Sequence, residues 1–276
     1  MRKSLLLVVV LLLAGQLPGQ SFKLLSWNIQ NLGGSKNEQE LAVMVDIMAN
    51  YDLVAVQEVV AKDPRGAQAV ARLADALNRS GSHWDYRVSE PTRSPSSYIS
   101  ERYAFLWKTS SIELVGRPFL DSELAEVCYR EPYIGRFRLK GDSSLFYVIN
   151  FHSRRYDEQP EEEIRHFYAY PQRLGTTALL IAGDFNLDES HPVWEPLYQQ
   201  GFAPALQQLP TTFKRACELN GGYFNHPIDN IYVHTGSFQL LQAGRIDFAG
   251  SCEQLSFARM ISDHVPVFSE LCFRRN

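Results

Sequence analysis

Residues 179–186 read LLIAGDFN, an apolar run that ends in a glycine, a carboxylate and an amide. The run belongs to a strand that we predict over Thr177–Ala182, and Asp184 and Asn186 follow it. One carboxylate after a strand is usually a turn former, but polar residues adjoin the ends of several other apolar runs of this chain. They are Asn28, Gln57, Glu58, Asn150, His152, Asp229, Asn230, Asp263 and His264. If these strands lie side by side, the polar side chains converge in one cleft.

The hydrophobic patterns predict strands and helices along the whole chain. Residues 37–48 have apolar side chains at helical spacing, with a capping box expected at Asn37 and Glu40. Further helices are predicted around Gln68–Asn78 and near Val193–Gln200. Besides Thr177–Ala182, the predicted strands are residues 22–29, 52–59, Arg102–Trp107, Ile134–Leu139, Leu145–Phe151, 230–234 and 265–273. Some strands follow one another directly and others are linked by helices, which favours a sheet-rich α+β sandwich over a doubly wound parallel sheet.

The N-terminus is typical of a secretory signal peptide. Two basic residues, Arg2 and Lys3, precede an apolar run from Leu5 to Ala14 that is too short to span a bilayer, and helix-breaking residues follow. We expect a signal peptide at residues 1–20 and export to a periplasm or out of the cell, with an uncleaved anchor as the alternative. The chain has 276 residues with 45% hydrophobic and 21% charged content, which is ordinary for a globular protein. Residues 21–276 are therefore expected to fold as one domain without a membrane span.

The net charge and the cysteine spacing exclude some classes of protein. The net charge is −4, and loss of Arg2 and Lys3 with the signal peptide would make the body more acidic. Such a body does not suit a protein that stays bound to nucleic acid, because that affinity comes from neutralised phosphates. It permits an enzyme that contacts nucleic acid briefly through local arginines and a divalent metal. The cysteines permit two disulfides in any of three pairings, and none has the spacing of zinc ligands. They are Cys128, Cys217, Cys252 and Cys272.

The polar residues at the strand ends have a common chemical meaning. Carboxylate and amide oxygens are hard ligands that suit Mg²⁺, with Mn²⁺ or Ca²⁺ as alternatives. Histidines titrate near neutral pH and can exchange protons. Two histidines among several carboxylates, without a required serine or cysteine nucleophile, indicate metal-assisted hydrolysis by water. A phosphodiester is the natural substrate, because its anionic transition state is stabilised by a cation.

A series of short motifs resembles the endonuclease/exonuclease/phosphatase superfamily, and its deoxyribonuclease I branch most closely. The motifs occur in the family's order and the resemblance runs from about Leu24 to Leu271. They are SWNIQN, VQEV, SERYAFLWK, REPYIGRF, INFHS, AGDFNLD, IDNIYV and ISDHVPV. The resemblance implies a four-layer α/β/β/α sandwich of two packed mixed sheets flanked by helices, so that residues 21–276 would be one catalytic domain.

The resemblance also implies a metal site and a phosphate site. Glu58 would hold the divalent cation with help from Asn28, and Asp263 would lie close enough to share it. Asp184 and Asn186 would orient the water and the scissile phosphate. Alone, Asn28 also fits the role of a turn residue at a strand end.

Two histidine–carboxylate pairs are implied as the proton-transfer groups. His264 would pair with Asp229 and His152 with Glu101, each carboxylate fixing the imidazole tautomer. We expect His264 to be the base and His152 the acid, although the near-symmetry of the site permits the reverse. Arg130 would contact substrate phosphate as a planar fork of donors. Without the resemblance, Glu101 also fits an ion pair at a strand start and Arg130 a turn.

The surface that would contact DNA departs from the pattern of the branch. Val60 stands where the branch has an arginine used in the minor groove, and Ile99 where it has a tyrosine, with Tyr98 one position away. The branch's structural calcium loop has no clear match in LPTTFKRACELNGG. Arg154 and Arg155 follow His152 closely enough to face the cleft.

The expected function is a secreted, Mg²⁺-dependent endonuclease that hydrolyses DNA with little sequence specificity to 5′-phosphate and 3′-hydroxyl ends. The alternatives are a phosphodiesterase or phosphatase of the same fold, acting on a phospholipid headgroup or nucleotide, and an exported toxin-like or binding subunit. A DNA substrate, a monomer and no stable protein partner are expected.

Overall fold

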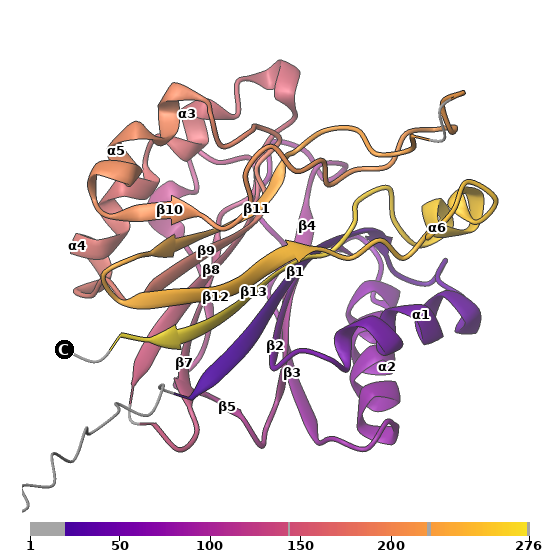
Figure 1. The fold of residues 1–276 in the computed structure, drawn as a ribbon, viewed down its shortest axis with the longest axis horizontal. Coiled ribbons are helices and arrows are strands. Elements are labelled where there is room, and N and C mark those ends of the chain that lie inside the picture. Colours follow the sequence, from indigo (N-terminus) through magenta and orange to yellow (C-terminus); the bar gives the residue numbers. More distant parts are fainter. Residues whose placement is uncertain (1–19, 143, 220–221, 275–276) are drawn as a thin grey trace, which may run out of the picture.

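The computed structural model describes residues 20–142, 144–219 and 222–274, which form two β-sheets packed face to face with helices outside them (Figure 1). The strands of the first sheet are β1 (Ser21–Leu32), β2 (Leu53–Val60), β3 (Trp84–Val88), β4 (Glu101–Lys108), β12 (Phe238–Arg245) and β13 (Val267–Phe273). Their order across the sheet is β12-β13-β1-β2-β4-β3. The central strands β1 and β2 are parallel, and the remaining pairs of this sheet are antiparallel.

The second sheet is also mixed. Its strands are β5 (Ile112–Leu114), β6 (Phe119–Leu120), β7 (Tyr133–Leu139), β8 (Leu145–His152), β9 (Leu179–Asp184), β10 (Phe202–Pro204) and β11 (Asp229–His234). Their order is β10-β11-β9-β8-β7-β5, with β6 paired to β7. Strands β8 and β9 are parallel, with His152 opposite Asp184 in the register. Because parallel strands end at the same edge, each sheet brings the carboxyl ends of two central strands together.

Helices cover the outer face of each sheet and complete four layers. On the first sheet lie α1 (Glu38–Met48) and α2 (Arg65–Arg79), with α6 (Leu255–Ile261) next to α1. On the second lie α3 (Glu161–Ile164), α4 (Tyr170–Leu174) and α5 (Glu195–Gln199). Figure 1 shows these two groups of helices on opposite sides of the sheets. The structure confirms the predicted four-layer α/β/β/α sandwich.

The alternation of side chains along β1 shows why the sheets pack in this way. Phe22 and Leu24 point between the two sheets, whereas Leu25, Trp27 and Ile29 point toward α1 and α2. A strand that is buried on both faces reads as a nearly continuous apolar run, as this one does. Asn28 therefore points between the sheets, at the end of the strand where the apolar core gives way to polar groups.

Most predicted elements are present, with shifted ends. The capping box is confirmed, because Asn37 accepts from the Glu40 amide and Glu40 accepts from the Asn37 amide. The short helix predicted near residues 193–200 is present as α5, with a 3₁₀ turn, Pro192–Trp194, directly before it. The elements that were not predicted include the short strands β3, β5, β6 and β10, the edge strand β12, and the helices α3, α4 and α6. β12 is an edge strand whose residues Gln239–Gln242 are exposed, and α6 has only seven residues, so neither carries a strong hydrophobic period.

The cysteines form one disulfide rather than two. Cys217 and Cys252 are bonded, with their Cα atoms 5.8 Å apart, while Cys128 and Cys272 are free and buried. None of the described helices is long and apolar enough to cross a membrane. The signal peptide expected at residues 1–20 lies outside the described residues, apart from Gln20.

Candidate active site

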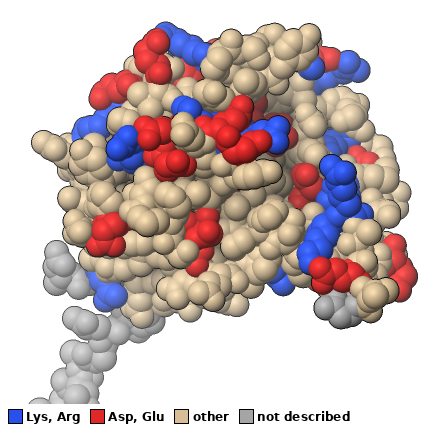
Figure 2. All heavy atoms as spheres, turned by 90° about the horizontal axis from the view of Figure 1, so that it is seen from above, with Lys and Arg blue, Asp and Glu red and all other residues tan. Residues whose placement is uncertain are grey.

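The predicted polar residues converge at one end of the sandwich, where β1, β2, β8 and β9 end and where β4 and β11 begin. Figure 2 shows this end from above, with acidic and basic side chains gathered around a hollow. Six functional groups come from strand ends of both sheets, and His264 comes from the segment between α6 and β13. The six are Asn28, Glu58, Glu101, His152, Asp184 and Asp229.

A buried polar layer supports this site from below. The Gln57 side-chain amide donates to Ser26 Oγ at 3.2 Å and to Asn150 Oδ1 at 2.6 Å, which links the two sheets. Asn150 Nδ2 donates in turn to the carbonyls of Val56 and Ala104, at 3.1 and 3.2 Å. Because buried amides are costly unless they are hydrogen-bonded, this layer fixes the ends of the strands relative to one another.

His264 is held by Asp229 and is placed to carry a positive charge. Its Nδ1 lies 2.9 Å from Asp229 Oδ2, and Thr211 Oγ1 donates to the same oxygen at 2.7 Å. Its Nε2 lies 3.6 Å from Asp184 Oδ2. Carboxylates only accept hydrogen bonds, so both ring nitrogens face acceptors. Burial lowers the pKa of His264, but the charges of Asp229 and Asp184 outweigh it and bring that pKa well above its usual value.

His152 occupies the opposite electrostatic environment. Its Nδ1 lies 3.0 Å from Glu101 Oε2, but its Nε2 faces Arg130 Nη2 at 3.2 Å. A guanidinium only donates, so this contact favours a neutral imidazole that accepts at Nε2, although Asp184 Oδ2 also lies 3.4 Å from that atom. Burial and the charge of Arg130 lower the pKa of His152 to about 4. Burial also raises the pKa of Glu101, while the ion pair with Arg130 at 3.2 Å opposes the rise.

Asp184 lies between the two histidines. Its Oδ2 is 3.4 Å from His152 Nε2, and the same oxygen accepts from Asn28 Nδ2 at 3.0 Å. Its other oxygen accepts from the Asn186 amide at 3.0 Å. Asn186 has a φ of 48°, in the left-handed region, and its side chain lines the cleft next to His264. Burial is the main cause that raises the pKa of Asp184.

Glu58 and Asn28 offer oxygen atoms that fit a divalent cation. Asn28 Nδ2 donates to Glu58 Oε1 at 3.1 Å, and the Asn31 amide donates to Glu58 Oε2 at 3.1 Å. The Asn28 Oδ1 atom is buried, and no described residue donates a hydrogen bond to it. Asn28 presents its Nδ2 to Glu58 here, but its unpartnered Oδ1 and the Glu58 carboxylate are oxygen ligands of the kind that hard cations prefer. The chain's own residues therefore fit the metal that the resemblance implies.

Asp263, expected to share the cation with Glu58, lies in the cleft, and its role at the metal stays a prediction. It lines the cleft on the side of His264, whereas Glu58 lines the side of His152. Among the described residues, Asp184, Asp229 and His264 form another group that could hold a metal ion, with ligand atoms within 4.8 Å of one another. In this group His264 Nδ1 and Asp229 are already hydrogen-bonded to each other.

The cleft has two cavities that meet at Arg155. One has a volume of about 360 Å³ and is lined by Glu58, Glu101, Arg130 and His152 among others. The other has a volume of about 770 Å³ and extends from His264 and Asn186 along the opposite side. Arg155 lines both, as its position after His152 suggested, but Arg154 pairs with the buried Glu163 at 3.0 Å instead.

Three further residues position the site and were not predicted. Ser262 Oγ accepts from the His264 amide at 3.0 Å and donates to the Asn28 carbonyl at 2.7 Å. Thr211 orients Asp229, and the buried Lys36 binds carbonyls at the end of α6. Of the three, only Ser262 lies within the motif that contains the histidine, ISDHVPV, and no local sequence pattern links Thr211 or Lys36 to the site.

Residues 25–264 match the model of the Endonuclease/Exonuclease/phosphatase family. The chain belongs to this family. It is 32% identical to a Deoxyribonuclease of Thioalkalivibrio sp. (strain K90mix), over 95% of this chain and 74% of that protein. It is 29% identical to Deoxyribonuclease-1-like 1 of Sus scrofa, over 96% of this chain and 85% of that protein.

A solved structure has the same fold. An endonuclease/exonuclease/phosphatase family protein from Bacteroides thetaiotaomicron superposes with a TM-score of 0.66 at 17% identity, covering 93% of this chain and 99% of that one. The family match and the relatives together place the chain in the deoxyribonuclease I-like branch, as a hydrolase that acts on phosphodiester bonds. The family depends on divalent metals, which agrees with the oxygen ligands of Glu58 and Asn28.

Proposed function

We propose that the protein is an exported, Mg²⁺-dependent endonuclease that hydrolyses DNA with little sequence specificity and acts as a monomer. The observation that carries the proposal is the pair of histidine–carboxylate contacts on either side of Asp184, one of which also faces Arg130. The surroundings lower the pKa of His152 and raise that of His264, which favours a neutral His152 and a protonated His264. Relatives named deoxyribonucleases support DNA as the substrate. The products would be 5′-phosphate and 3′-hydroxyl ends.

The protonation states give each histidine a role. Neutral His152 takes a proton from the attacking water, and Glu101 stabilises the imidazolium that forms. His264 begins as the imidazolium and donates a proton to the 3′-oxygen when its bond to phosphorus breaks. This order is the reverse of the one expected from the sequence, because Arg130 faces Nε2 of His152 and not that of His264. The water oxygen ends on the 5′-phosphate, and the leaving oxygen becomes a 3′-hydroxyl.

The remaining residues hold the reacting groups in place. Asp184 and the side chain of Asn186 orient the water and the phosphate, and Arg130 adds positive charge at the same edge. Glu58 and Asn28 would hold the divalent cation, which when bound neutralises charge on the phosphate oxygens. Hard oxygen ligands favour Mg²⁺, with Mn²⁺ or Ca²⁺ as substitutes.

A plasmid-nicking assay tests the proposal. Purified residues 21–276, which begin with the first residue of β1, should convert supercoiled plasmid to nicked circles with Mg²⁺ and stop when a chelator is added. End-labelling should find 5′-phosphates. Absence of nicking with Mg²⁺, Mn²⁺ and Ca²⁺, together with hydrolysis of sphingomyelin or a nucleotide, would instead favour the second function considered from the sequence. Light scattering tests the monomer, and cell fractionation with N-terminal sequencing tests export and cleavage after residue 20.

A further inference from the structure

The larger cavity of the cleft concentrates basic residues in a chain that is acidic overall. Its lining contains Arg155, Lys214, Arg215 and Arg259, but only two carboxylates, Asp188 and Asp263, while the whole chain has a net charge of −4. The cavity begins at His264 and Asn186, so these basic groups continue the candidate active site along one direction. A local basic surface next to a catalytic centre is the electrostatic footprint of a polyanionic substrate.

Residues 211–215, here called the basic loop, are fixed to the segment that carries His264. Thr212 forms a β-bridge with His264, and the Phe213 amide donates to the Asp263 carbonyl at 2.7 Å. The Val265 amide donates to the Thr211 carbonyl at 2.8 Å. These bonds run along both sides of His264, so the loop and the histidine keep a fixed distance from each other.

Three further contacts hold the basic loop from outside. Arg259 of α6 donates to the carbonyls of Phe213 and Lys214, at 2.9 and 3.3 Å. The Phe213 ring is buried and packs edge-on against Phe248, with the ring centroids 5.2 Å apart. The disulfide from Cys217 joins the chain just after the loop to the segment before α6. The loop is therefore preorganised, which lowers the entropy cost of binding.

The charged groups of the basic loop, and Arg155 on the same cavity, remain available to a ligand. Arg215 is exposed, and no carboxylate of the described residues lies within ion-pair distance of it. Lys214 pairs with the exposed Glu218, and the Arg155 side chain is 67% exposed beside Asp157. Such exposed pairs are weak, so a phosphate can replace the carboxylate at small cost. Arg259, by contrast, donates from Nη1 to two carbonyls of the loop and acts as a positioning residue.

We propose that Lys214, Arg215 and Arg155 bind backbone phosphates next to the scissile phosphate, and that this subsite makes the enzyme prefer polynucleotides over small phosphodiesters. The proposal rests on the proposed function, because it takes the scissile phosphate to lie at His264. One strand carries a phosphate for about every 3.4 Å of helix axis, so a cavity of about 770 Å³ beside the site has room for a neighbouring phosphate. A phospholipid headgroup ester or a mononucleotide has no phosphate to place there.

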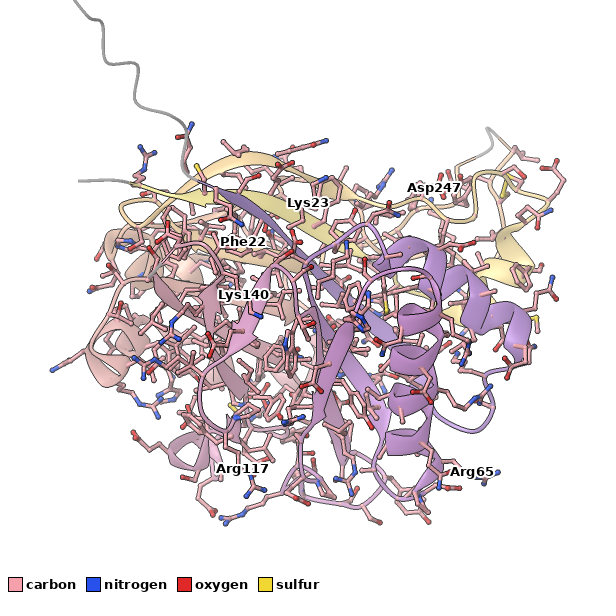
Figure 3. All side chains as sticks on the ribbon, turned by 90° about the horizontal axis from the view of Figure 1, so that it is seen from below. Phe22, Lys23, Arg65, Arg117, Lys140 and Asp247 are labelled. Atoms are coloured by element: carbon pink, nitrogen blue, oxygen red, sulfur yellow. A yellow bond between two sulfur atoms is a disulfide. The ribbon has the colours of Figure 1, made fainter. Side chains whose placement is uncertain are left out.

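The Lys214→Ala/Arg215→Ala double variant tests the subsite. Its kcat/KM for plasmid nicking should fall about tenfold or more relative to its kcat/KM for bis(4-nitrophenyl) phosphate, because the small diester does not reach the loop. The slope of log(kcat/KM) for nicking against log[salt] should become shallower by about one for each lost phosphate contact. Lys140→Ala, in the turn between β7 and β8 on the side shown in Figure 3, is the matched control and should change neither quantity.

The outcomes separate this proposal from the proposed function. The subsite proposal is wrong if the wild-type protein nicks DNA but the double variant keeps the wild-type salt slope. It is also wrong if the kcat/KM of the double variant falls by the same factor for both substrates. If the wild-type protein nicks no DNA, the proposed function fails. Binding of a fluorescein-labelled oligonucleotide to the His264→Ala protein then decides the subsite alone. A salt-dependent loss of affinity on adding Lys214→Ala/Arg215→Ala supports the subsite, and equal affinity overturns it.

Discussion

Replacement of Lys36 by methionine should destabilise the protein and impair its active site, although the residue contacts neither candidate histidine. The Lys36 side chain is 7% exposed, and its Nζ donates to the carbonyls of Met260 and Ile261 at 2.9 and 2.7 Å. These are the last carbonyls of α6, which ends directly before Ser262. Lys36 therefore fixes the backbone that leads to His264.

The size of the effect follows from these contacts. A hydrogen bond with a charged donor contributes about 1.5–3 kcal/mol, and a positive charge at a helix C-terminus about 0.3–1 kcal/mol. Burial lowers the pKa of Lys36, although Glu40, Glu58 and Asp263 oppose this, so the buried ammonium carries a desolvation cost that methionine removes. After this offset, the free energy of unfolding should fall by about 2–4 kcal/mol, which is large for a domain of ordinary stability.

Urea unfolding and hydrolysis of a small diester measure the two consequences. We expect a lower kcat under conditions where Lys36→Met is still folded, because His264 loses its fixed position. Lys23→Met is the matched control (Figure 3). The Lys23 side chain is 45% exposed, and its ion pair with Glu270 is long at 4.0 Å and therefore weak. Its cost should stay within about 1 kcal/mol. Equal unfolding free energies for the two variants would refute the structural role given to Lys36.

Three further changes probe the site directly. His264→Ala should lower kcat by about 10²–10⁴ with an unchanged circular dichroism spectrum; a loss under about tenfold would contradict its role. Asp229 raises the pKa of His264, and activity is lost as pH rises through that pKa if His264 is the acid. Asp229→Asn should therefore move the alkaline limb of the pH–kcat profile to lower pH, and a limb that stays in place speaks against the assignment. Glu58→Gln should weaken Mn²⁺ binding measured by calorimetry and raise the Mg²⁺ concentration needed for half-maximal rate, whereas unchanged binding would place the metal elsewhere.

The architecture was predictable because most of its central strands have a hydrophobic pattern that is visible in the local sequence. In β1, for example, the apolar residues and the polar residues that follow them are consecutive in the sequence, so both the strand and its polar end can be recognised there. The capping box of α1 is also local, since Asn37 and Glu40 are one turn apart. Strand β12 depends instead on pairing with β13, so its sequence alone did not distinguish it from a loop.

Many residues of the candidate site could be predicted from local sequence, but Lys36 and Thr211, which position it, could not. A strand end that carries His152 or Asp184 can be read from local sequence, because each follows an apolar run directly. Lys36 and Thr211 act through contacts with residues 225 and 18 positions away, which no local pattern encodes.

The two histidine–carboxylate pairs look equivalent until the atom facing each Nε2 is considered. In both pairs a carboxylate lies about as close to Nδ1, at 3.0 Å for His152 and 2.9 Å for His264. Both Nε2 atoms face Asp184 Oδ2, at 3.4 Å for His152 and 3.6 Å for His264, but His152 Nε2 also faces the Arg130 guanidinium, which can only donate. The asymmetry comes from Arg130, which sits 22 residues before His152 in the chain and is held by the Ser153 carbonyl at 3.0 Å. In the proposed mechanism, the position of Arg130 therefore favours His152 as the proton acceptor and leaves His264 as the donor.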